Sequence, residues 1–578
     1  MRMKAVNMTE RHQLRWCEII EKQARKHRVK GLSYAIVQEG VTVFEHHTGT
    51  VTASGRANDG AQKMMIGSNM KLLTALCILQ LHEQKKLSID APLSTYLPNL
   101  SIQSHTPINI MTIRDVLRHT SGLPSDDFNL ITDPNATLAD LPSRLKKHHL
   151  IASPNTMPAY SNIGYGLLGL VIEAVSGMAY ETYLENRINA VLKTTFQILE
   201  TQAKRAAFQA TISASFDKKG REVQDPLAVL TPAGSSTYAT MADLIRLMHV
   251  FMYPDRQRLL KEETMLQMIA PPLPMHEGVF HERTGLGMRH DYLCAYNKAV
   301  GPVMGHGGNT LYHHSTFDMF PKHRLGIIAM SNSEGGMAAI ASIHTKVRVE
   351  LFEAMGIVLA KQPKPVPYER IKPPKHLASA YVAPGLKLTV RQKENRLPRL
   401  KFMIFPFALK RCEDGFYQAL PRGLSRFPLI ASMVRRVRFK PAYLGDIAFL
   451  YIEQNSNYFR MRTPFAGVYA PTHVSSAWQK ALGTYHAKHP EGDRETLVDK
   501  AALTMKKGAL VLSFKTMQRR LSVYLRVLND QEAIIQGYGR MAGDTVYLSY
   551  EENRCTLRFY GIEVTQKLTE SASGKPDF

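Results

Sequence analysis

The spacing of apolar residues changes along the first 360 residues, and these changes predict the order of the secondary-structure elements. Leu32–Val37 and Val41–His46 are apolar runs of strand length separated by Glu39-Gly40, which is typical of a β-hairpin. Helical spacing predicts helices over residues 9–27, 68–81, 113–118, 164–175, 180–193, 241–251 and 338–354. Strand-like runs return at residues 303–305, 315–320 and 326–331. Strands at both ends of a helical middle predict one sheet covered by helices. We therefore expect a mixed α/β fold in which helices and a sheet form a sandwich (α+β).

The pattern changes after residue 360. Residues 361–376 carry alternating prolines, which resist helix formation and strand pairing, so we expect a semi-rigid linker there. The predicted division of the chain is a first domain over residues 1–360, the linker over 361–376, a β-rich segment or first barrel over 377–470, and an antiparallel barrel over 471–578.

Beyond the linker, short alternating runs recur at roughly even spacing, which favours an antiparallel barrel or sandwich. Hairpin turns are expected at Lys506-Lys507-Gly508 and at Asn529-Asp530. The sequence of residues 380–383 is weakly similar to that of residues 482–485. The sequence leaves open whether this region forms one barrel with an added segment or two barrels.

Length and composition are those of an ordinary globular protein of two or three domains, with 578 residues, 44% hydrophobic and 21% charged. Five scattered cysteines form no C-x-x-C pair, which argues against a disulfide framework or a zinc site and favours a reducing compartment. Residues 1–30 hold no continuous apolar stretch of the secretory kind, and no apolar run reaches the length of a membrane span. We expect a cytoplasmic location, unless a leader has been removed.

The formal net charge of +24 makes nucleic acid and anionic surfaces candidate partners. The basic residues form only short clusters, such as residues 435–440 and 518–520, and no nucleic-acid motif accompanies them. We therefore expect a dispersed basic surface and no nucleic-acid partner, with association to an anionic surface left as an alternative. The oligomeric state does not follow from the sequence.

Ser68 and Lys71 lie three residues apart at the start of a predicted helix, so their side chains share one helix face. Backbone N–H groups at a helix N-terminus favour negative charge on the serine oxygen, and the N–H of Ser68 can be one oxyanion donor. Serine needs a base within hydrogen-bond reach, and lysine serves as that base only when its pKa is lowered. An isolated S-x-x-K pattern more often marks a helix cap beside a surface lysine, so the motif needs support elsewhere.

Tyr160 and Asn162 come just before another predicted helix, in a loop from which both side chains can face one cleft. A tyrosine beside a lysine cation can share its proton and relay the serine proton to the leaving group. Asn162 would donate to a substrate amide carbonyl. The structural alternatives are a packed aromatic for Tyr160 and a helix N-cap for Asn162.

The segment His306-Gly307-Gly308-Asn309 is predicted at a strand edge. Gly307 and Gly308 would let a substrate backbone lie close against the strand. The N–H of Asn309 is the candidate second oxyanion donor. His306 would be a hydrogen-bond or cationic partner for the substrate, with a core or solvated histidine as the alternative.

Six segments occur in one order and at consistent spacing: Ile66–Lys71, Leu117–Pro124, Tyr160–Gly169, Pro232–Gly234, Gly285–Gly287 and Gly305–Gly308. Together they resemble the serine β-lactamase-related hydrolases of class C type, which include D,D-carboxypeptidases, D-aminopeptidases and esterases. The resemblance covers roughly residues 28–355. The form Tyr160-Ser161-Asn162, in place of Ser-Asp-Asn, is similar to the class C branch.

The resemblance implies a β-lactamase/transpeptidase-like domain with an antiparallel sheet and helices, a Ser68 acyl-enzyme, no metal and no organic cofactor. The implied substrate is a small molecule or peptide with a peptide, amide or ester bond, and substrates with a D-residue are among the implied candidates. His306 stands where class C β-lactamases usually carry a lysine, which implies weak or no β-lactamase activity. The C-terminal barrels of relatives are lipocalin-like and can lend a loop to the active site.

The chain departs from the family pattern after Gly308. Tyr312, His313 and His314 are bulky where relatives usually carry small residues, so we expect them to narrow the acyl pocket. Adjacent strand residues point to opposite faces, which argues against a metal site shared by the two histidines. The alternative to an enzyme is a non-catalytic or acylation-only binding or sensor protein on the same fold.

Overall fold

The structure of the protein is a computed structural model. It describes residues 9–103, 110–127, 137–146, 148–199, 201–223, 236–272, 283–290, 299–359, 377–393, 396–402, 404–444, 447–455, 460–487, 498–516, 520–551 and 553–567. The predicted linker at residues 361–376 and the segment Pro232–Gly234 lie outside the described residues.

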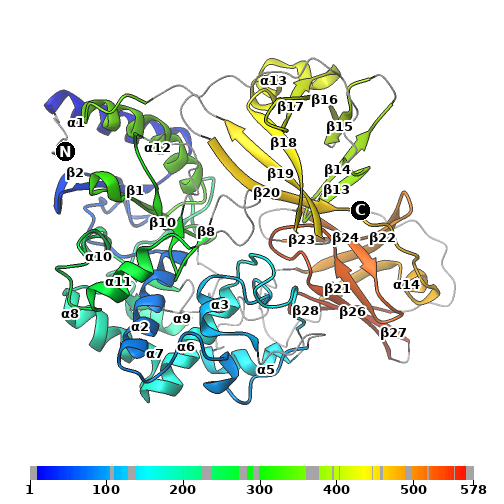
Figure 1. The fold of residues 1–578 in the computed structure, drawn as a ribbon, viewed down its shortest axis with the longest axis horizontal. Helices are drawn as coiled ribbons and strands as arrows, with labels where there is room; N and C mark the ends of the chain where they lie inside the picture. The colour runs from blue at the N-terminus through cyan, green and yellow to red at the C-terminus, as the bar shows by residue number, and fades with distance from the viewer. Residues whose placement is uncertain are drawn as a thin grey trace.

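The first part of the chain folds around an antiparallel sheet with the described strand order β2-β1-β12-β11-β10-β9-β8 (Figure 1). These strands are β1 (Gly31–Gln38), β2 (Val41–Gly49), β8 (Arg283–Thr284), β9 (Arg289–His290), β10 (Met304–Asn309), β11 (His314–Phe320) and β12 (Leu325–Ser331). The early hairpin lies beside a late strand, with Ser33 opposite Met330. The predicted sheet, built from both ends of this region, is confirmed.

Helices cover both faces of this sheet. They are α1 (Glu10–Lys26), α2 (Met70–Glu83), α3 (Ile113–Leu117), α5 (Leu141–Leu145), α6 (Asn162–Ser176), α7 (Tyr180–Leu184), α8 (Ala190–Leu192), α9 (Gln202–Ala207), α10 (Met241–Met252), α11 (Glu262–Ile269) and α12 (Gly336–Ala354). Alternate residues of β12 belong to different cores, Ile328 with α10 and Ile327 with α1 and α12. Figure 1 shows α1 and α12 together on one side of the sheet.

The helix α2 runs through a large apolar core. Every residue from Met70 to Leu81 is buried, including Lys71. A helix that is apolar on nearly all sides has no solvent face, so it packs centrally, here against α6 and α7. Each large apolar side chain buried in this way contributes about 1.5–3 kcal/mol. The N-terminal end of α2 is therefore firmly held.

The C-terminal region forms two closed barrels of eight strands each, which answers the question that the sequence left open. The first barrel comprises β13 (Ala380–Ala383), β14 (Leu386–Arg391), β15 (Arg399–Phe402), β16 (Phe405–Arg411), β17 (Tyr417–Pro421), β18 (Val437–Leu444), β19 (Ile447–Asn455) and β20 (Arg460–Val468). The second comprises β21 (Gly483–Ala487), β22 (Lys500–Lys506), β23 (Ala509–Lys515), β24 (Arg520–Val527), β25 (Glu532–Ile535), β26 (Thr545–Glu551), β27 (Arg554–Phe559) and β28 (Ile562–Lys567). Closure leaves no unpaired sheet edge.

Both predicted hairpin turns fall between strands of the second barrel. Lys507 and Gly508 join β22 to β23 with positive φ angles of 51° and 75°. Asn529 and Asp530 lie between β24 and β25. Short helices α13 (Pro428–Val434) and α14 (Ser476–Lys480) accompany the barrels. The exact division of the chain into domains stays a prediction.

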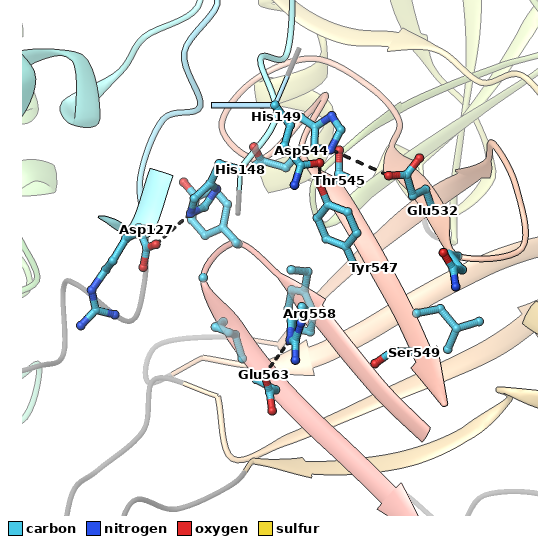
Figure 2. Close-up of a pocket in the computed structure, with 18 of the residues that line it drawn as sticks. Asp127, His148, His149, Glu532, Asp544, Thr545, Tyr547, Ser549, Arg558 and Glu563 are labelled. Atoms are coloured by element: carbon cyan, nitrogen blue, oxygen red, sulfur yellow. Dashed lines mark hydrogen bonds and ion pairs between the residues drawn. The ribbon is translucent and has the colours of Figure 1, made fainter. Parts of the chain in front are cut away.

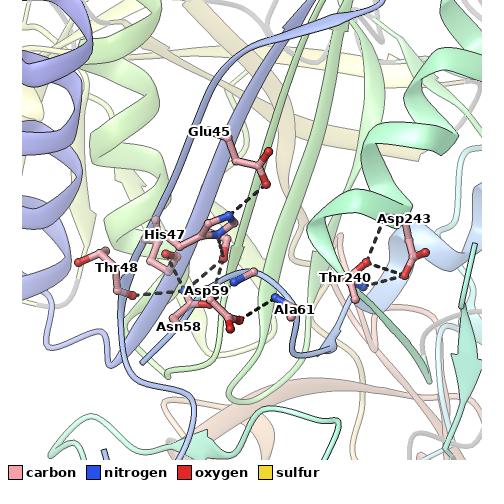
Figure 3. Close-up of polar contacts among 11 residues, drawn as sticks. Glu45, His47, Thr48, Asn58, Asp59, Ala61, Thr240 and Asp243 are labelled. Atoms are coloured by element: carbon pink, nitrogen blue, oxygen red, sulfur yellow. Dashed lines mark hydrogen bonds and ion pairs between the residues drawn. The ribbon is translucent and has the colours of Figure 1, made fainter. Parts of the chain in front are cut away.

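A polar cluster supports the β1–β2 hairpin (Figure 3). Asn58 donates to two backbone carbonyls across the strands, at 2.9 and 3.3 Å. His47 hydrogen-bonds with Glu45 at 3.0 Å. On α10, Thr240 and Asp243 form a reciprocal N-terminal cap. These contacts fix strands and helix ends in the scaffold.

Among the described residues, no single helix is long and apolar enough to span a membrane. Within these residues, one pair of helical segments, Asn162–Ser176 and Tyr180–Leu192, is long and apolar enough when the two are taken together, but the segments are bent by 79° relative to each other.

Candidate active site

Ser68 lies in a short 3-10 turn, η1 (Gly67–Asn69), directly before α2, rather than inside the helix as predicted. Two contacts to β11 hold this turn. Asn69 Nδ2 donates to Ser315 Oγ at 2.7 Å, and Ser315 Oγ donates to the Ile66 carbonyl at 2.7 Å. Ser68 is 7% exposed, so these contacts hold it at a fixed and largely buried position.

Two glycines allow the Ser68 turn to touch β10. Gly67 has φ +53°, and a Cβ there would lie 2.9 Å from the backbone nitrogen of Asn309. A Cβ on Gly308 would lie 1.8 Å from the Ile66 carbonyl oxygen. The backbone of Asn309 is therefore held against the turn that carries Ser68.

Lys71 and Tyr160 both reach the oxygen of Ser68. Lys71 Nζ donates to Ser68 Oγ at 3.1 Å, and the Tyr160 hydroxyl donates to the same oxygen at 2.7 Å. Lys71 Nζ also lies 4.9 Å from the centre of the Tyr160 ring. The structure thus brings together the three residues that the sequence proposed as catalytic.

Burial lowers the pKa of Lys71 below its ordinary value, and the adjacent Tyr160 only partly offsets this effect. Burial alone would raise the pKa of Tyr160, but the positive charges of Lys71 and Arg540 outweigh it and lower that pKa. Both shifts make it easier for the pair to give up one proton. A pair that has lost a proton can act as a base toward Ser68.

Asn162 is the first residue of α6, but the N-cap is Ser161, whose Oγ accepts from Gly164 N at 2.9 Å. The N-cap alternative for Asn162 is therefore wrong. Its Oδ1 accepts from Lys71 Nζ at 2.6 Å, and its Nδ2 donates to Asp126 Oδ1 at 2.6 Å. Its predicted donation to a substrate carbonyl stays a prediction, for which the second N–H of the amide is available.

Asp126 was not singled out from the sequence, and the second barrel supplies its other partners. The Tyr560 hydroxyl donates to Asp126 Oδ2 at 2.9 Å and also hydrogen-bonds with Ser125 Oγ. Burial raises the pKa of Tyr560, so the phenol keeps its proton and acts as a donor. Arg540 Nη1 lies 3.9 Å from Asp126 Oδ2. A chain of contacts thus runs from the barrel through Asp126 and Asn162 to Lys71.

A segment of the second barrel between β25 and β26 forms one wall of the cleft. The Arg540 guanidinium lies 5.4 Å from the centre of the Tyr160 ring, and its side chain is 58% exposed. A cavity of about 230 Å³ lies between this segment, residues 157–160 and the first barrel, which contributes Phe449 and Gly467. The loop contribution that the resemblance implied therefore comes from the second barrel, and the first barrel shares in the wall.

His306, Gly307, Gly308 and Asn309 lie within β10, whereas the sequence predicted a strand that ends at residue 305. Pairing with β9 ends at Gly305, so among the described residues the following positions pair only with β11. His306 is 2% exposed, and its Nδ1 hydrogen-bonds with the Gly307 carbonyl at 2.8 Å. Burial, helped by Arg289 and Lys71, holds the pKa of His306 well below its usual range. The imidazole is therefore neutral near pH 7, which argues against the cationic role.

His313 and His314 do not fill the cleft as expected. His313 Nε2 hydrogen-bonds with Ser215 Oγ at 3.0 Å, and its ring packs edge-on against Tyr238. His314 is buried beside Gly336, at the start of α12. Neither ring lines the cavity beside Tyr160. Within the described part of the chain, no group of three or more histidine, cysteine or acidic residues is placed to hold a metal ion.

Comparison with known proteins gives one family match. The beta-lactamase family model matches residues 17–349. Protein flp from Staphylococcus aureus (strain MW2) is 25% identical over 325 residues, which are 54% of this chain and 62% of that protein. The match thus spans less than two thirds of that relative. Penicillin-binding protein 4 from Amycolatopsis lactamdurans is 24% identical over 339 residues, covering 56% of this chain and 85% of that protein.

Solved structures share the fold. The crystal structure of SurE has a TM-score of 0.57 at 20% identity and covers 78% of this chain and 99% of its own. The octameric penicillin-binding protein homologue from Pyrococcus abyssi has a TM-score of 0.50 at 16% identity and covers 96% of this chain and 99% of its own. The likeness to the second structure extends over the barrels as well.

Proposed function

The chain belongs to the beta-lactamase family, and we propose that it is a serine hydrolase that cleaves a peptide, amide or ester bond through a covalent Ser68 acyl-enzyme. One observation carries the proposal. Two proton-transfer groups with lowered pKa values, Lys71 and Tyr160, hydrogen-bond to one serine oxygen at 3.1 and 2.7 Å.

In the first step, Ser68 Oγ forms a bond to the substrate carbonyl carbon. Its proton passes to the Lys71–Tyr160 pair, which must enter the reaction one proton short, as a neutral amine with a phenol or as an ammonium with a phenolate. The two forms belong to one coupled pair. Asn162 Oδ1, which accepts from Lys71 at 2.6 Å, keeps the amine directed toward the reacting atoms.

The developing oxyanion would accept hydrogen bonds from the backbone N–H groups of Ser68 and Asn309. The close approach of the Ser68 turn to β10 supports this role. The C–N or C–O bond then breaks, and the pair returns the proton to the leaving amine or alcohol. Water, deprotonated by the same pair, attacks the acyl-enzyme and releases a carboxylic acid and free Ser68.

The substrate class is proposed from the groups that face the cleft. Half-exposed Arg540 beside Tyr160 favours a substrate with an anionic group near the scissile bond. SurE, which shares the fold, has also been solved with D-Leu, and this supports a substrate with a D-residue. Neutral His306, in place of a lysine, supports weak or no hydrolysis of β-lactams. A D,D-peptidase, a D-aminopeptidase or an esterase would fit these features.

Steady-state hydrolysis of matched D- and L-dipeptide amides, p-nitrophenyl esters and a chromogenic cephalosporin tests this proposal, with Ser68→Ala as the control. We expect turnover of a D-configured amide or an ester by the wild type, little cephalosporin hydrolysis, and none of these activities in the variant. A stable adduct without turnover would instead favour the acylation-only sensor.

A further inference from the structure

A second, larger cavity lies between the first domain and the second barrel (Figure 2). Its volume is about 750 Å³, which is within the range of sites for small organic molecules. One side is formed by β26, β27 and β28, and the other by Asp140, Ser143, Arg144, His148 and His149. Tyr547 bridges the rim by donating to Gln103 Oε1 at 3.2 Å.

Five acidic residues line this cavity, against two arginines and two histidines, although the protein carries a net charge of +24. Most of them have partners. The pairs are Asp127 with His148 at 2.8 Å, Glu563 with Arg558 at 2.7 Å, Glu532 with His149 at 3.9 Å, and Asp140 with the Thr137 backbone N–H at 2.7 Å.

Asp544 differs from these acids. It is 4% exposed, it lines both this cavity and the smaller one beside Tyr160, and its Oδ2 has no hydrogen-bond partner among the described residues. Burial, together with the nearby Asp126 and Asp127, holds the pKa of Asp544 well above its usual range. Burying a carboxylate without a cation is strongly unfavourable, so Asp544 without a cationic partner is a neutral acid.

We propose that this cavity is a second ligand site, which binds the primary ammonium group of a small organic amine with Asp544 as its carboxylate partner. A bare metal ion fits poorly, because no cluster of three metal-binding side chains occurs among the described residues. The cavity is also far larger than an ion. Leu548, Phe559 and Ile562 in its wall provide apolar surface for the carbon skeleton of an amine.

The amine can come from two sources, because Asp544 borders both cavities. It can be a free small molecule, or it can be the amino end of a long substrate that extends from Ser68. Tyr560 lines the larger cavity and donates to Asp126, so an occupant also touches the contacts that hold Asn162 against Lys71. The binding itself does not depend on the proposed hydrolysis and can be measured without turnover.

Isothermal titration calorimetry of the full chain with 1,5-diaminopentane tests the proposal, with 1,5-pentanediol as the uncharged probe. We expect the diamine to bind and the diol not to bind. Asp544→Asn should weaken diamine binding by at least about tenfold, since it removes the charge and keeps the shape. Binding to the wild type should release a proton, seen as a heat that differs between phosphate and Tris buffers, and this difference should vanish in the variant.

Asp530→Asn, the same change on an exposed turn of the same barrel outside the cavity, is the matched control and should bind as the wild type does. Ser143→Trp, at an exposed position of α5 on the cavity wall, should block binding with Asp544 intact, which keeps a test available if Asp544→Asn misfolds. Absence of binding at millimolar diamine, or equal binding by wild type and the Asp544 and Ser143 variants, would overturn the proposal.

Hydrolysis of one substrate with and without a free amino end separates the two sources. A rise of KM in Asp544→Asn only for the amino-bearing form identifies the substrate as the source of the amine. Unchanged KM for both forms, together with weakened diamine binding, identifies a free amine. Both results support the ammonium site.

Discussion

At the scale of single residues, the proposed mechanism depends on how Lys71 and Tyr160 share a proton. Arg540 lowers the pKa of Tyr160, whereas Asp126 raises that of Lys71, so these two neighbours act in opposite directions on one pair. Both neighbours were missed in the sequence. Tyr560 and Arg540 are more than 400 positions from Asp126, and no local spacing connects them.

Arg540→Gln should move the acidic limb of the kcat/KM profile to higher pH. The reactive form of the pair has lost one proton and is populated only above the lowest pKa of the pair. Without the positive charge of Arg540 that pKa rises, so activity is lost at a higher pH than in the wild type. The profile should be recorded beside Arg558→Gln, whose charge pairs with Glu563 away from Tyr160. Superimposable acidic limbs for wild type and Arg540→Gln would show that Arg540 does not act on the pair.

Asp126→Asn tests whether Asp126 positions Asn162 against Lys71. A carboxylate only accepts hydrogen bonds, so it turns the NH₂ group of Asn162 toward itself and the oxygen toward Lys71. An asparagine at position 126 removes this constraint and a charge-assisted bond worth about 1.5–3 kcal/mol, so kcat/KM should fall roughly tenfold to a hundredfold.

A second readout separates positioning from loss of structure in this variant. Loss of the Asp126 charge lowers the pKa of Lys71 further, so the acidic limb should move to lower pH, opposite to Arg540→Gln. Asp127→Asn, which changes the neighbouring carboxylate paired with His148, is the matched control. A uniform loss of activity with an unmoved limb would contradict the positioning role.

At the scale of elements, the site depends on how closely β10 approaches the turn before α2. The sequence identified α2 well, because Met70–Leu81 is a mostly apolar run whose length is typical of a helix rather than a strand. It predicted β10 too short, because His306-Gly307-Gly308-Asn309 shows no apolar alternation and becomes a strand only by pairing with β11. The sequence-based expectation that His313 narrows the cleft failed because its ring packs on Tyr238 instead.

Gly308→Ala should damage both stability and catalysis. The new Cβ would meet the Ile66 carbonyl oxygen at 1.8 Å, so β10 must move away from the Ser68 turn. We expect a loss of about 1–3 kcal/mol in the free energy of unfolding and a slower reaction of Ser68 with acylating probes. In Gly307→Ala the nearest atom, the Ser315 carbonyl oxygen, lies at 3.8 Å. Urea unfolding that gives equal stabilities for the two variants would refute the packing argument.

At the scale of the whole molecule, both barrels line the cavity beside Tyr160, and the second barrel also contacts Asp126. The sequence predicted β-rich domains from evenly spaced short runs, but it could not decide between one barrel and two. Barrel closure depends on pairing between first and last strands, such as His486 with Thr565, which are remote in the chain. For the same reason, only the family resemblance predicted that a barrel contributes a loop to the active site.

Buried neutral histidines should make the protein lose stability in mild acid. Burial lowers the pKa of His313 to about 3 and that of His314 to about 4. An unfolded histidine takes up a proton below about pH 6.5, so between that pH and the folded values the unfolded chain binds more protons. The free energy of unfolding should therefore fall as pH drops from about 6.5 toward 4.

Urea unfolding at several pH values measures this slope. His314→Gln should flatten it by removing one group that binds a proton on unfolding, whereas His486→Gln, at an exposed position, should leave it unchanged. A slope that is the same in His314→Gln as in the wild type would contradict this assignment.

Intact-mass measurement after incubation with a fluorophosphonate probe shows whether Ser68 is an activated nucleophile. We predict that the wild type gains the mass of one phosphonyl group and that Ser68→Ala gains none. Labelling of neither protein, or equal labelling of both, would contradict the account and leave a binding protein on a hydrolase fold.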